Sequence, residues 1–218
     1  QYVLPNYNFS KDFFYDNLDG GFNFSSSGYN TLYSTNVSET RIANDLGFLT
    51  FDNFFTNGIK TNFEFALKNV NSMGKNIDKY KNSPQSEIMS AYYYNVSLPL
   101  AKNSVTRRNT LVPKLSLRVS PHEMKNNSNS GRRIDADSAF SSNRISLGDS
   151  FEEGQSLTLG IDFFKEKVNV KNIVTKTRAG DDKVKKITEI EEYFDLKLAM
   201  ALRLNEEEYS LKYGEVAL

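Results

Sequence analysis

Apolar and polar residues alternate along several extended stretches of this chain. Between Asn57 and Asn69, Phe63 and Phe65 fall on one side of an extended backbone, while Lys60 and Glu64 fall on the other. This period of two predicts a strand with one apolar and one polar face. The apolar face could pack on a soluble core, or it could face lipid while the polar face lines a hydrated lumen.

The same alternation recurs along the chain and predicts successive antiparallel strands with almost no helix. The segment 193–205 is rich in Leu, Ala and Met, so a helix competes there. Its strict period of two would spread the apolar side chains around a helix, which favours a strand. We expect strands at residues 20–29, 31–41, 45–54, 57–69, 86–100, 110–120, 155–163, 168–175 and 193–205.

The connections between the expected strands fall into two classes. Most are brief, but residues 70–85 and 121–153 form long polar connections, the second with a short strand expected only at 144–147. Short turns at one rim and long loops at the other are typical of transmembrane barrels. Pro113 lies inside the segment 110–120, which indicates an edge strand or a locally irregular one.

The strand lengths also favour a membrane barrel. The clearest segments alternate over about 9 to 13 residues, close to the roughly 9 to 11 that cross a bilayer at a tilt. Aromatic clusters at Phe13–Tyr15, Phe54–Phe55 and Tyr92–Tyr94 could supply interfacial girdles. The predicted fold class is therefore all-β, an antiparallel transmembrane β-barrel segment of about ten strands with long extracellular loops and short periplasmic turns.

Composition limits the other possibilities. The chain has 218 residues, 27 basic and 27 acidic side chains, and no cysteine. A net charge of zero gives no electrostatic reason to expect nucleic acid as a partner. No apolar run reaches the length of about 18 residues that a transmembrane helix needs. The first residue is Gln1 rather than Met, so we expect the chain to be processed or cut from a longer one.

Candidate chemistry is sparse. His122 is the only histidine, and without a second histidine or a cysteine it is expected to be a loop residue rather than a base or a metal ligand. The acidic residues of 121–153 do not have calcium-loop spacing, and we expect Arg132, Arg133 and Arg144 to pair with neighbouring aspartates rather than with phosphates. The motifs of nucleophile elbows, P-loops and dinucleotide sites are also missing. We therefore expect no catalytic residues, no cofactor and no metal.

Several short motifs resemble one known family. They are VLPNYNFSK at 3–11, NDLGF at 44–48, LVPKLSLRVSP at 111–121 and, most specifically, DSAFSSNRISLGDSFEEGQSLTLGIDF at 137–163. Together they resemble the central barrel region of the LptD family, also called the organic solvent tolerance protein family. Ile145 and Ser150 depart from the family pattern. The matching motif residues are Phe140, Asn143, Arg144, Gly148, Asp149, Glu152 and Gly154.

The resemblance implies a function and a location. It implies that residues 1–218 are a partial barrel domain from the outer membrane of a Gram-negative bacterium, without the family's periplasmic jellyroll and terminal gate strands. The family transports lipopolysaccharide and inserts it into the outer leaflet. Its partners are the lipoprotein LptE, which plugs the lumen, outer-membrane lipid, and periplasmic bridge proteins that dock through an N-terminal domain. A soluble β-rich binding module and a porin-like channel remain the alternatives.

In such a barrel, the polar sides of the strands would face the lumen. The candidates for lumen-facing residues are Lys60, Asn62, Glu64, Lys68, Lys114, Ser116, Arg118, Lys197 and Arg203.

Overall fold

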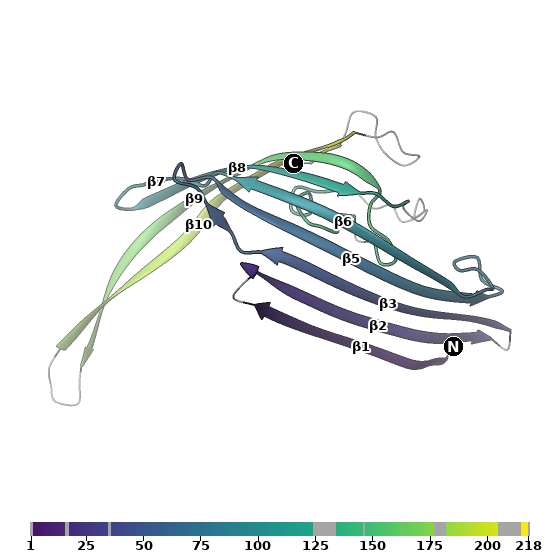
Figure 1. Cartoon of the computed structure of the whole chain (residues 1–218). Coiled ribbons are helices and arrows are strands. Elements are labelled where there is room, and N and C mark those ends of the chain that lie inside the picture. The colour runs from purple at the N-terminus through teal and green to yellow at the C-terminus, as the bar shows by residue number, and fades with distance from the viewer. Residues whose placement is uncertain are drawn as a thin grey trace.

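The chain forms one curved antiparallel sheet that is not closed (Figure 1). The computed structural model describes residues 2–15, 18–34, 36–123, 134–145, 147–176, 182–204 and 215–217. In these ranges the all-β, antiparallel prediction is confirmed. The strands are β1 (Tyr2–Tyr15), β2 (Gly20–Ser34), β3 (Val37–Thr50), β4 (Asn53–Phe54), β5 (Lys60–Lys75), β6 (Gln85–Ser97), β7 (Leu100–Asn103), β8 (Arg107–Ser120), β9 (Gly154–Lys176), β10 (Asp182–Arg203) and β11 (Glu215–Ala217).

Strands adjacent in sequence are adjacent in the sheet. The order is β1-β2-β3-β5-β6-β8-β9-β10-β11, with the short β4 paired to β5 and the short β7 paired to β8. Such a meander needs only local connections, so chain order fixes which strands are neighbours. None of the described segments forms a helix with the length and apolar character that a membrane crossing needs.

The break between β6 and β7 is explained by two prolines. Ser97 pairs with Lys114 and Leu100 pairs with Leu111, so the register continues across the break. Pro99 lies in this gap and Pro113 lies opposite it on β8, and neither has an amide proton for the ladder. Strand β8 itself runs through Pro113 without a break or a register shift and is not an edge strand, so the prediction of an edge or irregular strand there is wrong; the interruption lies in its partner, between β6 and β7.

Several predicted boundaries are wrong. Residues 20–29, 31–41 and 45–54 were expected as three strands, but residues 20–34 and 37–50 form the long strands β2 and β3. Strand β1 was not among the predicted strands. Strand β5 continues to Lys75, so the connection expected at 70–85 is limited to 76–84.

The error on β5 has a physical cause. Along β5 the apolar face changes side: Phe65 and Leu67 share one face, whereas Val70 lies on the other with Asn69 and Asn71 opposite to it. The backbone of β5 stays extended where the apolar side changes. The alternation of apolar and polar residues, from which the strand was predicted, stops there. Instead of the expected short strand at 144–147, Arg144 and Ile145 lie in a turn and Leu147 is irregular.

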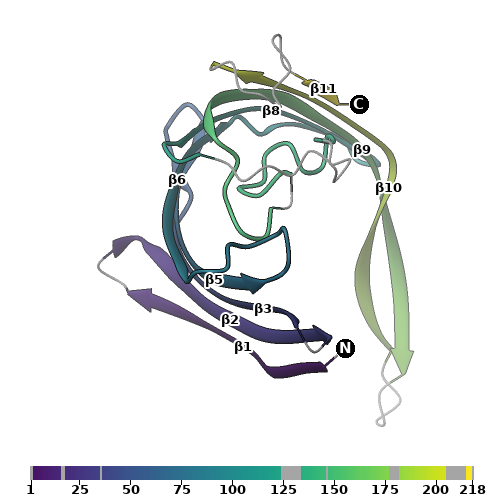
Figure 2. The ribbon, with the colours of Figure 1, turned by 90° about the vertical axis from the view of Figure 1, so that its right-hand side faces the viewer.

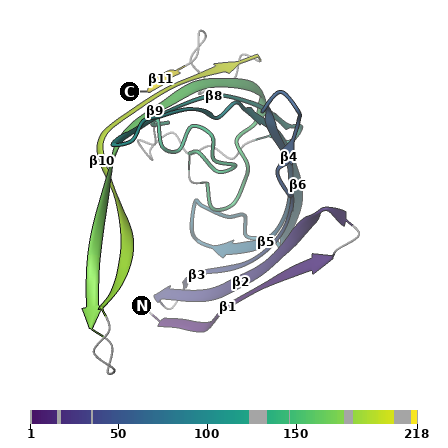
Figure 3. The same ribbon diagram turned by 90° about the vertical axis from the view of Figure 1, so that its left-hand side faces the viewer.

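The sheet curls around its own loops and leaves a gap between its two edges (Figures 2 and 3). Side chains therefore divide into a concave and a convex set. Most of the concave set is small or polar, and its best-buried members include Ala43, Val70, Ser156 and Thr158, with Met89 and Tyr93 as larger members. The convex set contains the large apolar side chains, such as Leu117, Ile161 and Leu196, which are 40%, 42% and 41% exposed. This distribution is the reverse of the usual soluble protein, in which large apolar residues fill the interior.

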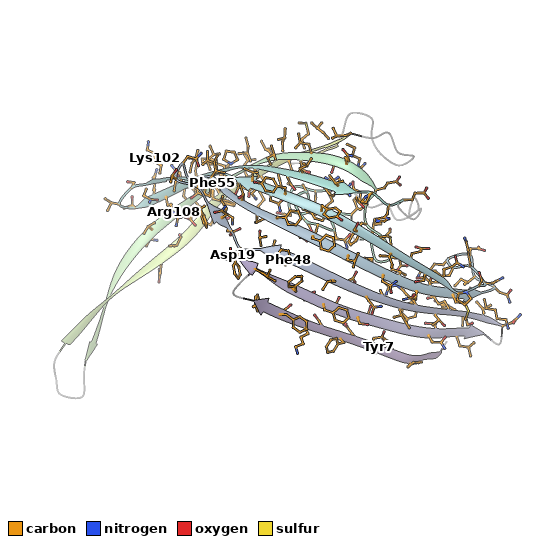
Figure 4. The ribbon with its side chains drawn as sticks, in the orientation of Figure 1. Tyr7, Asp19, Phe48, Phe55, Lys102 and Arg108 are labelled. Carbon is orange, nitrogen blue, oxygen red and sulfur yellow. The ribbon has the colours of Figure 1, made fainter. Side chains whose placement is uncertain are left out.

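An aromatic row crosses the convex face. The register aligns Phe22 with Phe48, Phe48 with Phe65, and Phe65 with Tyr92. The ring centroids of Phe22 and Phe48 are 4.6 Å apart, and those of Phe65 and Tyr92 are 5.2 Å apart. Cross-strand aromatic pairs of this kind stabilise a register; Phe48 is labelled in Figure 4.

The two ends of the sheet differ. The connections 76–84 and 121–153 leave from one end, which we call the loop end. At the other end, which we call the hairpin end, β9 and β10 continue past the last pairs with β8 as a two-stranded hairpin (Figure 1). The long connections therefore share one end, but the longest protrusion of strands lies at the opposite one.

Candidate functional site on the concave face

The connection between β8 and β9 folds back into the hollow of the sheet (Figure 2). We call residues 134–145 and 147–153 the inner loop. It contacts side chains from β3, β5, β6, β8, β9 and β10, which are far apart in the sequence. The inner loop therefore bridges strands from both halves of the sheet.

One carboxylate and three guanidinium groups form the most buried part of this contact. Arg144 donates two parallel hydrogen bonds to Glu152, each 2.7 Å long. Arg203 on β10 donates to Oε1 of the same carboxylate at 2.9 Å, and Arg118 on β8 lies 3.4 Å from it. The hydroxyls of Ser156 and Thr158 accept further hydrogen bonds from Arg144. Paired, bidentate geometry of this kind is what a buried charge requires.

The electrostatics of Glu152 follow from these partners. Burial by itself would raise the pKa of its carboxyl. The hydrogen bonds from Arg144 and the charges of Arg118, Arg144 and Arg203 outweigh burial and lower the pKa of Glu152 to about 2. Glu152 is therefore a charged anchor at neutral pH and is not available as a general acid or base.

A second anchor joins the inner loop to β3. Asp149 is paired with Arg41 and accepts a 2.7 Å hydrogen bond from the hydroxyl of Tyr80. Arg41 also donates to the carbonyl of Gly148 at 2.9 Å. Burial opposes ionisation of Asp149, but the Tyr80 hydroxyl and the Arg41 charge lower the pKa of Asp149. Burial and the hydrogen bond to Asp149 raise the pKa of Tyr80.

Small apolar contacts complete the packing. Ile134 and Ala139 pack on Ala199 and Ala201 of β10. Phe140 covers Gly160, where a Cβ atom would lie 2.6 Å from the ring and 2.8 Å from the carbonyl oxygen of Leu198. The absence of a side chain at Gly160 is therefore what lets the ring approach the sheet.

A separate apolar contact lies over β3, β5 and β6. There Phe151 packs on Ala43, Val70 and Met89.

The residues predicted to face a lumen all lie on the concave side of their strands. Most of them form ion pairs or hydrogen bonds with other side chains of the protein. Lys68 pairs with Asp45 at 2.5 Å, and Lys114 pairs with Asp162. Lys197 pairs with Asp137 of the inner loop at 2.6 Å. Arg118 and Arg203 contact Glu152, and Ser116 is buried on β8.

The remaining three predicted residues, Lys60, Asn62 and Glu64, come from the first half of β5. Near the hairpin end, Lys60 pairs with Asp52, and Asn62 donates to the same carboxylate. Glu64 interacts with Ser142 of the inner loop.

The residues of the family-like motif converge within the inner loop. Asn143 braces it internally, because its side chain accepts from the amide of Leu147 and donates to that residue's carbonyl. Gly154 has a φ of 82°, a left-handed conformation that favours glycine, at the point where β9 begins. Phe140, Arg144, Gly148, Asp149 and Glu152 make the contacts described above. The expectation that Arg144 pairs with a neighbouring aspartate is wrong, since its partner is Glu152; Arg132 and Arg133 lie outside the described residues.

Sequence reasoning missed several members of this site. Arg41, Tyr80 and Tyr93 all contact the inner loop, the last by donating to the carbonyl of Ser142 at 2.5 Å. Arg41 and Asp149 are 108 positions apart, so no local spacing relates them. The only sequence signal for Arg41 is its place in the alternation of β3, where it points inward next to the outward Ile42.

The contacts of this arrangement are those of an anchored loop. His122 lies outside it, with its ring 3.2 Å from the hydroxyl of Ser90. Among the residues that the structure describes, no group of three or more metal-ligating side chains is arranged to hold an ion. What the site does physically is to hold a loop across the hollow of the sheet through two charged anchors.

The chain was compared with family models, with curated proteins and with solved structures. None of the three comparisons found a match.

Proposed function

We propose that this chain is part of the wall of a Gram-negative outer-membrane β-barrel that transports lipopolysaccharide and inserts it into the outer leaflet. The single observation that carries the membrane placement is a continuous apolar belt on the convex face. The lipopolysaccharide function is supported by the resemblance of residues 137–163 to the LptD family. Lipopolysaccharide, membrane lipid, an LptE-like lipoprotein and periplasmic bridge proteins are its partners in this proposal.

The belt spans most of the sheet. On β8, outward positions carry apolar side chains from Leu111 to Val119, and on β9 from Leu157 to Phe163. Such a run of outward positions on β8 covers about 27 Å along the strand at ~3.4 Å per residue. After tilting, this height is comparable with the roughly 25 Å apolar band of outer-membrane barrels.

The belt also slants across the strands. Its centre lies between Phe22 and Phe24 on β2, and near Leu198 on β10. The hydrogen-bond register, however, leads from Phe22 to Leu204 through Phe48, Phe65, Tyr92, Val119 and Gln155.

This slant gives a tilt angle. The centre of the belt shifts by six to seven residues, about 20–24 Å at ~3.4 Å per residue, over six inter-strand spacings of ~4.8 Å. The corresponding angle is about 35–40°, within the roughly 35–45° at which strands of membrane barrels are tilted. A soluble sheet would have no reason to arrange its apolar residues at this angle. The slant therefore supports a planar apolar surrounding such as the hydrocarbon layer of a bilayer.

The concave face supports a barrel with a filled interior. In a diffusion porin the interior is a water-filled passage. Here the inner loop occupies the hollow and is held by the Glu152 and Asp149 anchors. This observation favours a barrel with a filled interior over the porin-like alternative.

The soluble alternative needs a different partner. If the convex face were not in lipid, a second layer would have to cover Leu117, Ile161, Leu196 and their neighbours. Transfer into detergent micelles separates the two: a membrane barrel should gain β signal there, whereas a soluble module should fold equally well in plain buffer.

Depletion tests the transport function. Reducing the level of the protein in its own bacterium should lower the amount of newly made lipopolysaccharide that reaches the cell surface, measured with a label that reacts only at the surface. Unchanged surface lipopolysaccharide after depletion would refute the transport proposal while leaving the membrane placement intact.

A further inference from the structure

A row of basic side chains borders the apolar belt at the hairpin end. Lys102 pairs in register with Asn109, and Asn109 pairs with Lys165. In the next outward row, Arg107 pairs with Lys167. We call Lys102, Arg107, Lys165 and Lys167 the basic margin; Lys102 is labelled in Figure 4.

The basic margin lies on the convex face. Leu111 and Phe163, two residues nearer the centre of the sheet, are the last apolar members of the belt on β8 and β9. Because side chains alternate along a strand, Asn109 and Lys165 point to the same side as these residues. The basic side chains therefore follow directly after the last apolar side chains of the belt.

Aromatic rings hold part of this margin. The ammonium group of Lys165 lies 5.4 Å from the ring centroid of Phe163 and 5.1 Å from that of Phe194. The ammonium group of Lys167 lies 5.6 Å from the ring of Tyr193. Cation–π contacts of this kind position the charge without neutralising it. Lysine and aromatic residues together are typical of the membrane–water interface.

Few acidic groups oppose these charges. Glu191 pairs in register with Lys167 on the outward side. Glu166 is on the concave side, where it lies 3.7 Å from Arg108. Among the side chains that the structure describes, the four basic groups of the margin thus lie beside two outward carboxylates, Glu191 and, two residues farther out, Glu189, although the whole chain has equal numbers of both charges.

We propose that the basic margin binds the phosphate group of an anionic membrane lipid. Lys102 and Lys165 flank Asn109 on adjacent strands, about 10 Å apart between Cα atoms, so both ammonium groups can reach one phosphate. The acyl chains of the same lipid lie along Leu100, Leu111 and Phe163. This inference rests on the proposed function, because it requires the belt to be in hydrocarbon.

Lipid selectivity tests the proposal. The protein is reconstituted in phosphatidylcholine vesicles with trace spin-labelled phosphatidylglycerol or phosphatidylcholine, and electron paramagnetic resonance measures the motionally restricted fraction of each. We expect a preference of about fivefold for the anionic lipid, as expected for one effective basic contact near a membrane surface. High salt should remove this preference from the wild-type protein by screening.

A matched pair of variants locates the effect. Lys102→Gln/Lys165→Gln should abolish the preference. Lys75→Gln/Lys81→Gln makes the same change of charge at exposed positions of the loop end and should preserve it. A preference that survives in the first variant, or that high salt does not reduce, overturns the inference.

The outcomes also separate the two proposals. Equal restriction of both lipids by the wild-type protein would overturn the phosphate site and leave the membrane placement standing. No restricted lipid of either kind would overturn the membrane placement, and the phosphate site with it.

Discussion

The carboxylate of Glu152 is the shared anionic partner of three guanidinium groups. Glu152→Gln removes the charge but keeps the shape of the side chain, so Arg118, Arg144 and Arg203 lose their common anion. Breaking a buried pair from one side costs about 3–5 kcal/mol. Reversible denaturant unfolding in micelles should therefore show a loss of this order in the free energy of unfolding.

The exposed pair Lys197–Asp137 provides the control. The side chain of Asp137 is 78% exposed, so Asp137→Asn should cost less than about 1 kcal/mol. Equal losses for the two variants would show that the Glu152 cluster does not anchor the inner loop.

The same residue predicts a pH dependence. Since the pKa of Glu152 falls from its ordinary 4.5 to about 2 on folding, the unfolded chain binds more protons between these values. The contribution of Glu152 to the free energy of unfolding is therefore complete above about pH 4.5 and is lost as the pH falls toward 2. Its magnitude is of order 3 kcal/mol. The difference in unfolding free energy between wild type and Glu152→Gln should therefore shrink over this range. A difference that stays constant down to about pH 2 would contradict the lowered pKa.

Gly160 tests the contact between the inner loop and β9. Gly160→Val places a Cβ atom against the Phe140 ring and the backbone carbonyl of Leu198, which cannot both move away cheaply. We expect a loss of about 1–3 kcal/mol, typical of overpacking. Gly148→Val is the control, because a Cβ atom at Gly148 meets nothing within 4 Å. Equal effects would argue against close packing of Phe140 on the sheet.

At the scale of the elements, adjacent positions of β2 separate the two faces. Phe24 lies on the convex belt, while Asn23 lies on the concave face and hydrogen-bonds to Asp12. In lipid, Phe24→Arg should cost about 2–4 kcal/mol if it lies near the midplane, and Asn23→Arg about 0–1 kcal/mol. Unfolding in lipid vesicles measures both. Similar costs at the two positions would contradict a lipid-facing belt.

The strands were predictable only where one face stayed apolar. Segments such as 110–120 and 155–163 keep that alternation and lie within β8 and β9. On β2, β3 and β5 the outward side becomes polar toward the loop end, where Ser26, Asn44 and Asn69 form a hydrogen-bonded row. The strands continue there because backbone pairing continues, which a hydrophobic pattern does not report.

The site was less predictable than the strands. The motif residues of 137–163 are close in sequence, and they do converge in the inner loop. Their partners Arg41, Arg118 and Arg203 come from β3, β8 and β10, and only the curvature of the whole sheet brings these strands around the loop. Long-range charge pairing of this kind leaves no local signal.

At the scale of the whole molecule, the slant of the belt predicts how the sheet sits in a bilayer. Polarised infrared spectroscopy of the protein in oriented bilayers should give a strand tilt of about 35–45° from the membrane normal. The tilt follows from the register and the belt alone. Strands lying flat in the membrane plane would contradict it.

The most direct test asks what touches the convex face. The chain has no cysteine, so a single cysteine can be introduced and spin-labelled at each position without first replacing native cysteines. Along β8, labels at Pro113, Leu115 and Leu117 in lipid vesicles should be accessible to oxygen and protected from a water-soluble nickel complex. Labels at Val112, Lys114 and Ser116 should lack the high oxygen accessibility of a lipid-facing site. Access of the nickel complex to the first set would place the belt in water and contradict the account.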